Sequence, residues 1–299
     1  MKNTSTDSGT TRKVAHIFGA TPTHWVGNGF LVQSLLSYND AHRNCDPFLL
    51  LDYAAPHVFA PNFGQPRGVG QHPHKGFETV TIAYKGEVTH RDSSGGGGTI
   101  SEGDVQWMTA GGGIVHEEFH SKSFSEVGGP FEMVQLWVNL PAKDKETPAA
   151  YQPLTKEQIP VLPLPDNAGS LRLIAGDYEG MKGAASTFTS INVWDLRLEP
   201  HAAVSLPLPA SHNLAMVILE GEVFFADGSK AKQGELVIFE RDGSAVRLQT
   251  VEQNSRVLFL SGEPIGEPVV GYGPFVMDTQ EGIIRAFEEY EQGKFGTIN

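Results

Sequence analysis

The chain has 299 residues, of which 39% are hydrophobic and 19% are charged, and its formal net charge is −13. This length suffices for two domains of about 150 residues, each with its own hydrophobic core. The acidic balance, without any Lys/Arg cluster, argues against direct binding to nucleic acid. A single cysteine, Cys45, excludes an internal disulfide and fits a reducing compartment, so we expect a cytoplasmic protein.

The first twelve residues are rich in Ser, Thr and Gly, and they lack the apolar core of a signal peptide. No later stretch approaches the roughly 18 consecutive apolar residues of a membrane-spanning helix. We therefore expect a disordered N-terminal lead and no membrane partner.

Short alternating runs rich in Val, Ile, Thr and aromatic residues are punctuated by 34 glycines and 19 prolines, which predicts an all-β protein. The strands predicted in the first half are 48–52, 78–84, 87–91, 105–109, 114–119 and 133–140. Those predicted in the second half are 171–175, 191–198, 215–219, 222–226, 235–240 and 256–260. Apolar residues at helical spacing predict one helix over 280–292.

A weak internal repeat divides the chain into two similar halves. Gly86-Glu-Val, followed by Gly103-Asp, is echoed by Gly221-Glu-Val, followed by Gly234-Glu. Such a repeated unit of strand, glycine turn and strand indicates two tandem domains, and the proline-bearing segment between them is typical of an extended linker. The predicted organisation is a lead over 1–12, an N-terminal domain over 13–145, a linker over 146–165 and a C-terminal domain with the helix over 166–299.

Four potential metal ligands come in two pairs, each separated by one residue: His72 with His74, and His116 with Glu118. Side chains two apart in a strand point to the same face, so two strands can aim four ligands into one cavity. Five of the 11 histidines lie between positions 72 and 120, which disfavours scattered surface or core roles. Three imidazoles and one carboxylate suit one divalent ion of Fe, Mn, Co, Ni, Cu or Zn, and leave two octahedral positions open.

The second half lacks an equivalent ligand set. When the two halves are aligned on their glycine turns, the positions opposite the four ligands are Pro207, Pro209, Arg247 and Gln249. His201 and His212 remain there, but they are isolated, and we expect surface or structural roles for both.

Several other features have a structural interpretation. His90-Arg91-Asp92 is expected to form a surface polar network, because no serine nucleophile in a strained turn accompanies it. Gly95–Gly98 is expected to be a flexible hairpin loop, because no helical pattern follows that would complete a phosphate-binding loop. Five large apolar residues are candidates for lining an aromatic-substrate pocket, although a core role is favoured: Trp107, Met108, Phe119, Met133 and Trp137.

Three segments together resemble the pirin family of the cupin superfamily: His72–Thr81, Gly86–Ser93 and Gly103–Glu118. The resemblance extends over nearly the whole chain, from Phe48–Asp52 to Gly273–Met277. It implies two tandem cupin (jelly-roll) β-barrels with a short C-terminal helix, of which only the N-terminal barrel holds metal, usually iron. The C-terminal barrel is then the one that lacks metal ligands.

Carried over to this chain, the ligands of the family are His72, His74, His116 and Glu118, and Fe(II) is the favoured ion. Family members resemble flavonol dioxygenases with quercetin as the usual test substrate, which implies a small aromatic substrate and O₂ as partners. Glu118 is a candidate catalytic residue that accepts the proton of the substrate 3-hydroxyl. The alternative is an iron-binding regulatory protein that acts through protein partners without turnover. We expect a monomer.

Two positions depart from the general cupin pattern. In the wider superfamily the residue matching Glu78 is often a ligand, and it shares a face with His74 if the strand continues through Gly76. We favour Glu118 as the ligand and expect Glu78 to orient an imidazole, a role that metal-bound histidines usually require. His120 occupies the place of a later cupin asparagine, and we expect an exposed residue at a strand end.

Overall fold

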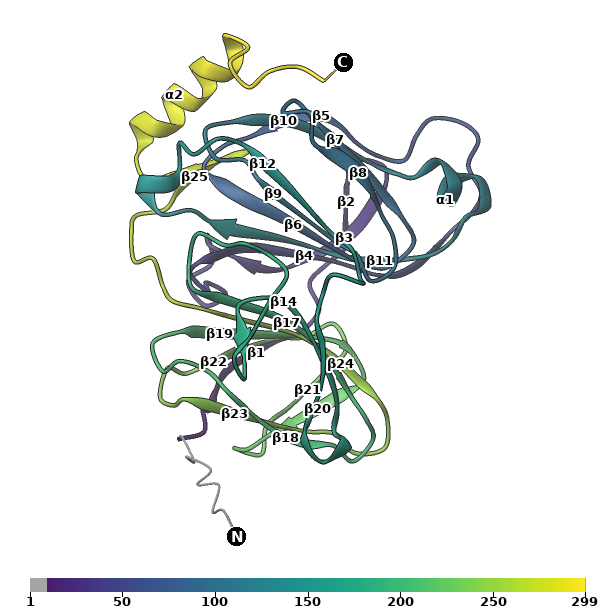
Figure 1. Cartoon of the computed structure of the whole chain (residues 1–299), viewed down its shortest axis with the longest axis vertical. Helices are drawn as coiled ribbons and strands as arrows, with labels where there is room; N and C mark the ends of the chain where they lie inside the picture. Colours follow the sequence, from purple (N-terminus) through teal and green to yellow (C-terminus); the bar gives the residue numbers. More distant parts are fainter. Residues whose placement is uncertain (1–9, 299) are drawn as a thin grey trace.

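The computed structural model describes residues 10–298, which form two β-barrels stacked along the long axis of the molecule (Figure 1). The all-β prediction is confirmed, and every predicted strand overlaps an observed one, with β9 (Val105–Thr109) and β17 (Ile191–Leu198) matching to the residue. Within residues 10–298 the α-helices are α1 (Lys122–Val127), which was not predicted, and α2 (Gln280–Glu291), which was. Neither is long and apolar enough to cross a membrane.

The N-terminal barrel consists of a seven-stranded and a four-stranded antiparallel sheet, with strand orders β12-β9-β6-β11-β4-β3-β2 and β5-β10-β7-β8. Its remaining strands are β2 (His24–Val26), β3 (Phe30–Ser37), β4 (Phe48–Phe59), β5 (Gly68–His74), β6 (Phe77–Lys85), β7 (Val88–Asp92), β8 (Gly97–Ile100), β10 (Ile114–His120), β11 (Gly129–Asn139) and β12 (Ala150–Leu154).

The C-terminal barrel repeats this layout, with strand orders β1-β22-β19-β24-β17-β14-β13 and β18-β23-β20-β21. Its other strands are β1 (Val14–Phe18), β13 (Val161–Pro163), β14 (Gly169–Ala175), β18 (Ala203–Pro207), β19 (Asn213–Glu220), β20 (Glu222–Phe225), β21 (Lys230–Lys232), β22 (Leu236–Phe239), β23 (Ala245–Gln249) and β24 (Ser255–Gly262). Two hairpins complete the chain, β15 (Asp177–Tyr178) with β16 (Met181–Lys182) and β25 (Val270–Tyr272) with β26 (Phe275–Met277).

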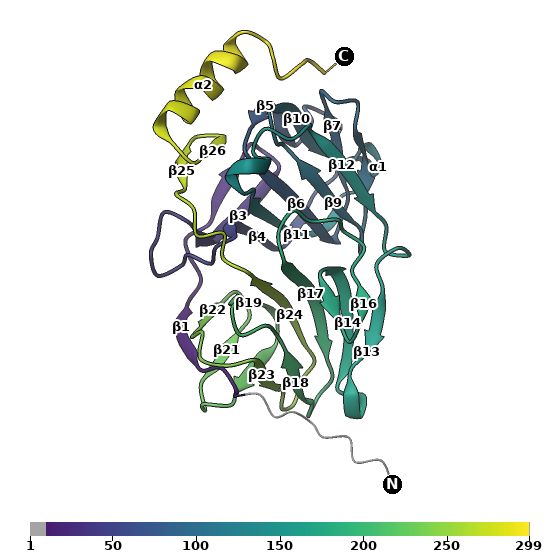
Figure 2. The same ribbon diagram turned by 60° about the vertical axis from the view of Figure 1, so that its left-hand side comes forward.

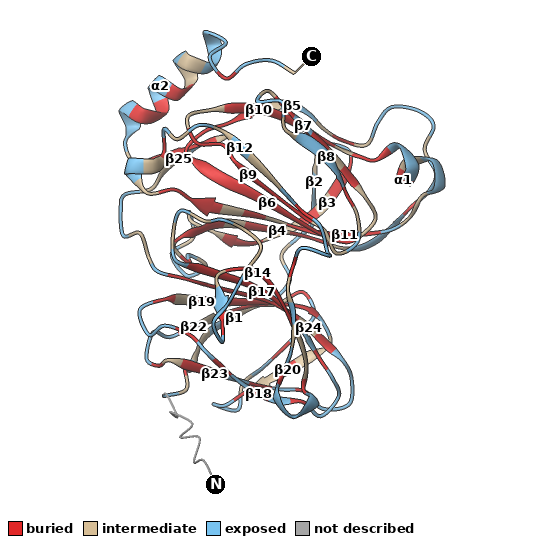
Figure 3. Cartoon of the chain, in the orientation of Figure 1, coloured by how far each residue is buried: buried red, intermediate tan, exposed pale blue. Residues whose placement is uncertain are grey.

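The two seven-stranded sheets pack against each other and share one hydrophobic core. Val80 and Ile82 of β6 lie in the same buried cluster as Val217 of β19 and Leu258 of β24. Since side chains alternate across a strand, the other face of each sheet lines the interior of its own barrel. Both faces of these sheets are therefore buried, as the colouring of the central strands in Figure 3 shows.

Three segments lie across the predicted domain boundaries. β1, predicted in the N-terminal domain, pairs with β22 of the C-terminal barrel, whereas β12, predicted as linker, pairs with β9. The hairpin β25–β26 and α2, predicted in the C-terminal domain, pack instead on the N-terminal barrel (Figure 2). The physical reason is that sheet edges need partners, and local sequence does not specify which edge a strand will cover.

Only the end of the predicted disordered lead falls within the described residues, and that end is ordered. Thr11 forms a β-bridge with Ala245, and the buried Arg12 side chain donates to the carbonyl oxygens of Gly243 (2.8 Å) and His212 (2.7 Å). Residues 1–9 lie outside the part that the structure describes.

A buried ion pair crosses between the two barrels. Glu132 of β11 is completely buried and accepts hydrogen bonds from Tyr53 Oη (2.8 Å) and from Arg256 Nη2 of β24 (2.6 Å). The Arg256 guanidinium also lies 4.5 Å from the centre of the Tyr84 ring. Polar contacts thereby link the two barrels beside the apolar core that they share.

Arg256→Met is expected to lower the free energy of unfolding by about 3–5 kcal/mol, because it leaves the Glu132 carboxylate buried without its cationic partner. Denaturant titration would measure the loss. Lys182→Met is the matched control: it breaks an exposed pair with Asp177 (3.2 Å) and should change stability by less than about 1 kcal/mol. Equal effects of the two substitutions would contradict the structural role of the buried pair.

Candidate metal centre

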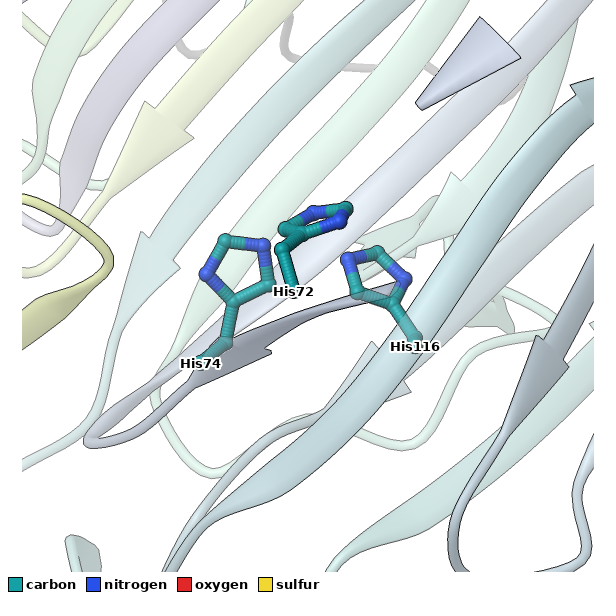
Figure 4. A group of neighbouring side chains, drawn as sticks. All are labelled: His72, His74 and His116. Atoms are coloured by element: carbon teal, nitrogen blue, oxygen red, sulfur yellow. The ribbon is translucent and has the colours of Figure 1, made fainter. Parts of the chain in front are cut away.

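Three of the four predicted ligands meet on the four-stranded sheet of the N-terminal barrel. β5 and β10 are antiparallel, and His72 lies directly opposite His116. The ring centre of His116 lies 4.2 Å from that of His72 and 4.8 Å from that of His74. One nitrogen of each ring lies within 4.8 Å of the others, and Figure 4 shows the three rings gathered around a common space.

Local structure explains how β5 presents its two histidines. His72 and His74 are two residues apart in an extended strand, so both side chains face the barrel interior. The following Gly76 has a φ of +89°, and a Cβ at this position would lie 2.0 Å from the carbonyl oxygen of Val276. Glycine therefore permits the close approach of β26, which covers the end of β5.

The hydrogen bonds of the histidines leave a nitrogen of each free for an ion. Nδ1 of His72 lies 2.8 Å from the Gly70 carbonyl oxygen, and Nδ1 of His74 lies 3.2 Å from that of Pro274. Because a carbonyl oxygen only accepts, both Nδ1 atoms carry the hydrogen and both Nε2 atoms keep a lone pair. Nε2 of His116 is buried without a hydrogen-bond partner. The three residues thus fit a transition metal ion.

Burial also keeps the rings of His74 and His116 neutral. Burial, reinforced by the neighbouring His72, lowers the pKa of His74 to about 3. Burial and the same group of histidines hold the pKa of His116 well below its ordinary value. Neutral imidazole is the ligand form of histidine, so these two side chains need not lose a proton before they bind metal at neutral pH.

Glu118 lies beside this group but is not part of it. Its Oε1 accepts hydrogen bonds from Thr81 Oγ1 (3.3 Å) and Gln106 Nε2, which places the carboxylate on the interior face. A carboxylate oxygen of Glu118 lies within 4.8 Å of a nitrogen of His116 and of His90. The structure therefore assembles three predicted ligands and sets the fourth next to His116.

The prediction of a surface network at residues 90–92 is wrong. His90 and Asp92 are buried and hydrogen-bonded to each other (3.0 Å), and only Arg91 projects outward, where it pairs with Glu117. The signal was present in the sequence, because His90 and Asp92 have the same spacing of two as the ligand pairs. His90 lies next to His116, so sequence reasoning overlooked a neighbour of the site.

The expectation that Glu78 orients an imidazole is also wrong. Glu78 shares its face of β6 with Val80 and Ile82, which belong to the core between the barrels, and its Oε1 accepts a hydrogen bond from Thr109 Oγ1 (2.8 Å). The turn at Gly76 separates β5 from β6, so the face of His74 does not continue to Glu78. This carboxyl group points away from the histidines.

His120 is buried rather than exposed. Its Nε2 donates to the Gly29 carbonyl oxygen (2.9 Å), and its ring stacks on Phe131 at a centroid distance of 4.7 Å. Burial lowers the pKa of His120 to about 4.

In the C-terminal barrel, His212 is buried as a structural residue between the hydroxyl groups of Ser190 (3.4 Å) and Ser261 (3.3 Å).

Among the large apolar candidates, Trp137 lies beside a predicted ligand. Its ring lies 5.4 Å from that of His74 and 4.3 Å from that of Phe77, between centres. Trp107 and Met133 belong to buried hydrophobic clusters, as the favoured core interpretation predicts. The histidines thus have an aromatic wall on one side.

Comparison with known proteins relates this chain to a family. The pirin family model matches residues 29–138, and the model of the pirin C-terminal cupin domain matches residues 193–296. A Pseudomonas aeruginosa protein named "Putative quercetin 2,3-dioxygenase" is 50% identical over 95% of this chain and 98% of its own length. Pirin-like protein 2 of Arabidopsis thaliana is 37% identical over 90% of this chain and 81% of its own length.

A solved structure has the same fold. The crystal structure of quercetin 2,3-dioxygenase from Acinetobacter baumannii is 49% identical to this chain and superposes with a TM-score of 0.92, covering 97% of this chain and 100% of that one. Together with the family models for both barrels, these relatives show that the chain belongs to the pirin family.

Proposed function

We propose that the N-terminal barrel binds one divalent transition metal ion, with Fe(II) favoured, through Nε2 of His72, His74 and His116 and a carboxylate oxygen of Glu118. The observation that carries this proposal is the group of three imidazoles with free Nε2 atoms, of which that of His116 is buried and unpaired. Buried polar atoms normally have a partner, and a metal ion is the partner that suits three converging lone pairs.

We further propose that the protein is a dioxygenase that opens the ring of a quercetin-like flavonol with O₂ and releases carbon monoxide. The names of the Pseudomonas and Acinetobacter relatives support this substrate class. The aromatic wall formed by Trp137 and Phe77 suits a flat polycyclic molecule. When bound, the ion supplies Lewis-acid stabilisation of the substrate oxyanion and a site for O₂.

The role assigned to Glu118 follows from its surroundings. Thr81 and Gln106 both donate to Oε1 and hold the carboxylate in place, so we assign Oε2 to the reacting side of the residue. In this assignment Glu118 takes the proton of the 3-hydroxyl group as the substrate enters, a role that would require a labile bond between its carboxylate and the ion. Trp137, beside His74, positions the flavonol ring by stacking.

Glu118→Gln is expected to lower flavonol turnover by about 10²–10⁴-fold at equal metal content, because an amide cannot accept the substrate proton. Steady-state turnover of quercetin, normalised to the metal content of each preparation, measures the effect. Glu117→Gln is the matched control, since Glu117 points outward and pairs with Arg91. Undiminished turnover of Glu118→Gln would rule out the base role.

The same assay separates the dioxygenase from a second candidate, a regulatory protein. Relatives in plants are named as pirins without any activity in the name, and an iron-binding regulator is the function without turnover that fits such relatives. If fully metallated wild-type protein leaves quercetin intact in aerated buffer, while oxidation of the metal alters binding to a protein partner, the regulatory function replaces the enzymatic one.

Glu78→Gln tests two consequences of the buried position of Glu78, one for stability and one for metal binding. Burial raises the pKa of Glu78 to about 7, so the folded protein holds a proton that the unfolded chain has released above about pH 4.5. The Glu78 contribution to stability is therefore lost as the pH rises from about 4.5 to 7. In metal-free protein, Glu78→Gln should raise the melting temperature relative to wild type at pH 8 but not at pH 4.

Thermal unfolding at the two pH values checks this stability difference, and elemental analysis checks the ligand assignment. Because Glu78 faces the core between the barrels, the Glu78→Gln protein should bind the same amount of metal as wild type. Loss of the ion from this variant would instead identify Glu78 as the fourth ligand.

A further inference from the structure

We propose that Asp92 and His90 act as positioning residues that hold the hydrogen of His116 on Nδ1 and so keep Nε2 available as a metal ligand. The inference rests on the proposed metal centre and deepens it. It concerns which nitrogen of a neutral ring carries its hydrogen, and it involves no change in the charge of the site.

The three side chains form a continuous buried chain of contacts. Asp92 Oδ2 lies 3.0 Å from His90 Nε2, and His90 Nδ1 lies 3.3 Å from His116 Nδ1. The side chains of His90 and Asp92 are fully buried, and the His90 ring stacks on Tyr151 with an interplanar angle of 13°. Burial and stacking restrict the rotation of the His90 ring, which preserves this order of contacts.

The hydrogen positions follow from the carboxylate. An ionised carboxylate only accepts hydrogen bonds, so His90 Nε2 carries the hydrogen that faces Asp92. In a neutral ring, His90 Nδ1 then has a lone pair, and the hydrogen in the contact between the two Nδ1 atoms belongs to His116. His116 is therefore protonated on Nδ1 and bare on Nε2.

The opposite arrangement, in which His90 Nδ1 donates and His116 Nδ1 accepts, is physically unfavourable. If His90 Nδ1 donated to His116, then His116 Nδ1 would have to accept, and the hydrogen of His116 would lie on Nε2. That N–H group would be buried without an acceptor, because His116 Nε2 has no hydrogen-bond partner. Buried N–H groups without an acceptor are rarer than buried acceptors without a donor. The arrangement with the His116 hydrogen on Nδ1 is therefore favoured.

A tight turn holds Asp92 in the required orientation. Its Oδ1 accepts three hydrogen bonds, from Ser94 N (2.8 Å), Ser94 Oγ (2.6 Å) and Gly96 N (3.0 Å). These donors keep Oδ1 in the turn and leave Oδ2 to face His90. The glycine-rich loop thus anchors the outer end of the contact chain.

Asp92→Asn reverses the direction of the hydrogen bonds between Asp92, His90 and His116 with minimal change in side-chain shape. The three donors require an oxygen at the Oδ1 position, so the new amide group places its NH₂ toward His90 Nε2. His90 Nε2 must then accept, His90 Nδ1 becomes the donor, and the hydrogen of His116 moves to Nε2. An N–H at that atom blocks the lone pair through which His116 would bind metal.

The direct readout is the ¹⁵N chemical shifts of the imidazole rings in metal-free protein, with His116 assigned by comparison with His116→Ala. We expect the hydrogen on Nδ1 in wild type and on Nε2 in Asp92→Asn. The affinity for Zn²⁺, measured by competition with a chelator, should fall about 10- to 100-fold in Asp92→Asn. A hydrogen on His116 Nε2 in wild type would overturn the inference.

The matched control is Asp227→Asn in the C-terminal barrel. Asp227 Oδ1 accepts from Ser229 N (3.0 Å) and Ser229 Oγ (2.5 Å), as Asp92 Oδ1 accepts from both atoms of Ser94, but its Oδ2 accepts from Val14 N (2.8 Å) instead of facing a histidine. Zn²⁺ affinity should be unchanged in this variant. An equal loss in both variants would mean that a general effect on folding, and not the position of a hydrogen, lowers the affinity.

His90→Gln supplies the second test, which holds even if Asp92→Asn fails to fold. A glutamine amide can donate to Asp92 and accept from His116, so this variant should keep the His116 hydrogen on Nδ1 and retain Zn²⁺ affinity close to wild type. A hydrogen on Nε2 in this variant would count against the inference. None of these measurements uses a flavonol, so inactivity toward quercetin would reject the proposed reaction and leave this inference standing.

Discussion

The antiparallel pairing of β5 with β10 is the constraint on which the site depends, because it sets His72 directly opposite His116. Side chains alternate along a strand, so a slip of one residue would turn either ligand pair to the outer face of the barrel. The C-terminal segment stabilises this register from outside: Phe275 bridges to Lys75, and the Pro274 carbonyl fixes the ring of His74. The site of the N-terminal barrel is thus completed by the other end of the chain.

The two barrels share one arrangement of strands but differ in the side chains on their four-stranded sheets. The sheet that carries histidines in the N-terminal barrel corresponds to β18 and β23 in the other barrel, where the buried side chains are Val204, Leu206, Val246 and Leu248. Apolar side chains line these two strands on the interior face, so they offer no ligand atoms to an ion. The C-terminal barrel instead provides a buried face for the N-terminal seven-stranded sheet, so its contribution to the site is structural.

Much of this arrangement could be predicted from the sequence, since it depends on local periodicity. Alternation located the strands, helical spacing located α2, and the spacing of two identified the three histidines that converge. Non-local features could not be predicted in this way. Nothing near Val14–Phe18 specifies that β1 pairs with β22. The turn at Gly76 places Glu78 on the opposite face from the one we expected. The same spacing of two occurs in His90 and Asp92, but we interpreted these residues as part of a surface polar network, whereas both are buried beside the site.

A crystal structure of the metal-loaded protein would show whether a single ion is held by the three Nε2 atoms of the N-terminal barrel. The proposed site predicts one anomalous peak about 2.0–2.2 Å from Nε2 of His72, His74 and His116. A loaded crystal without a peak there, or with the ion bound through Nδ1 of these residues, would contradict it.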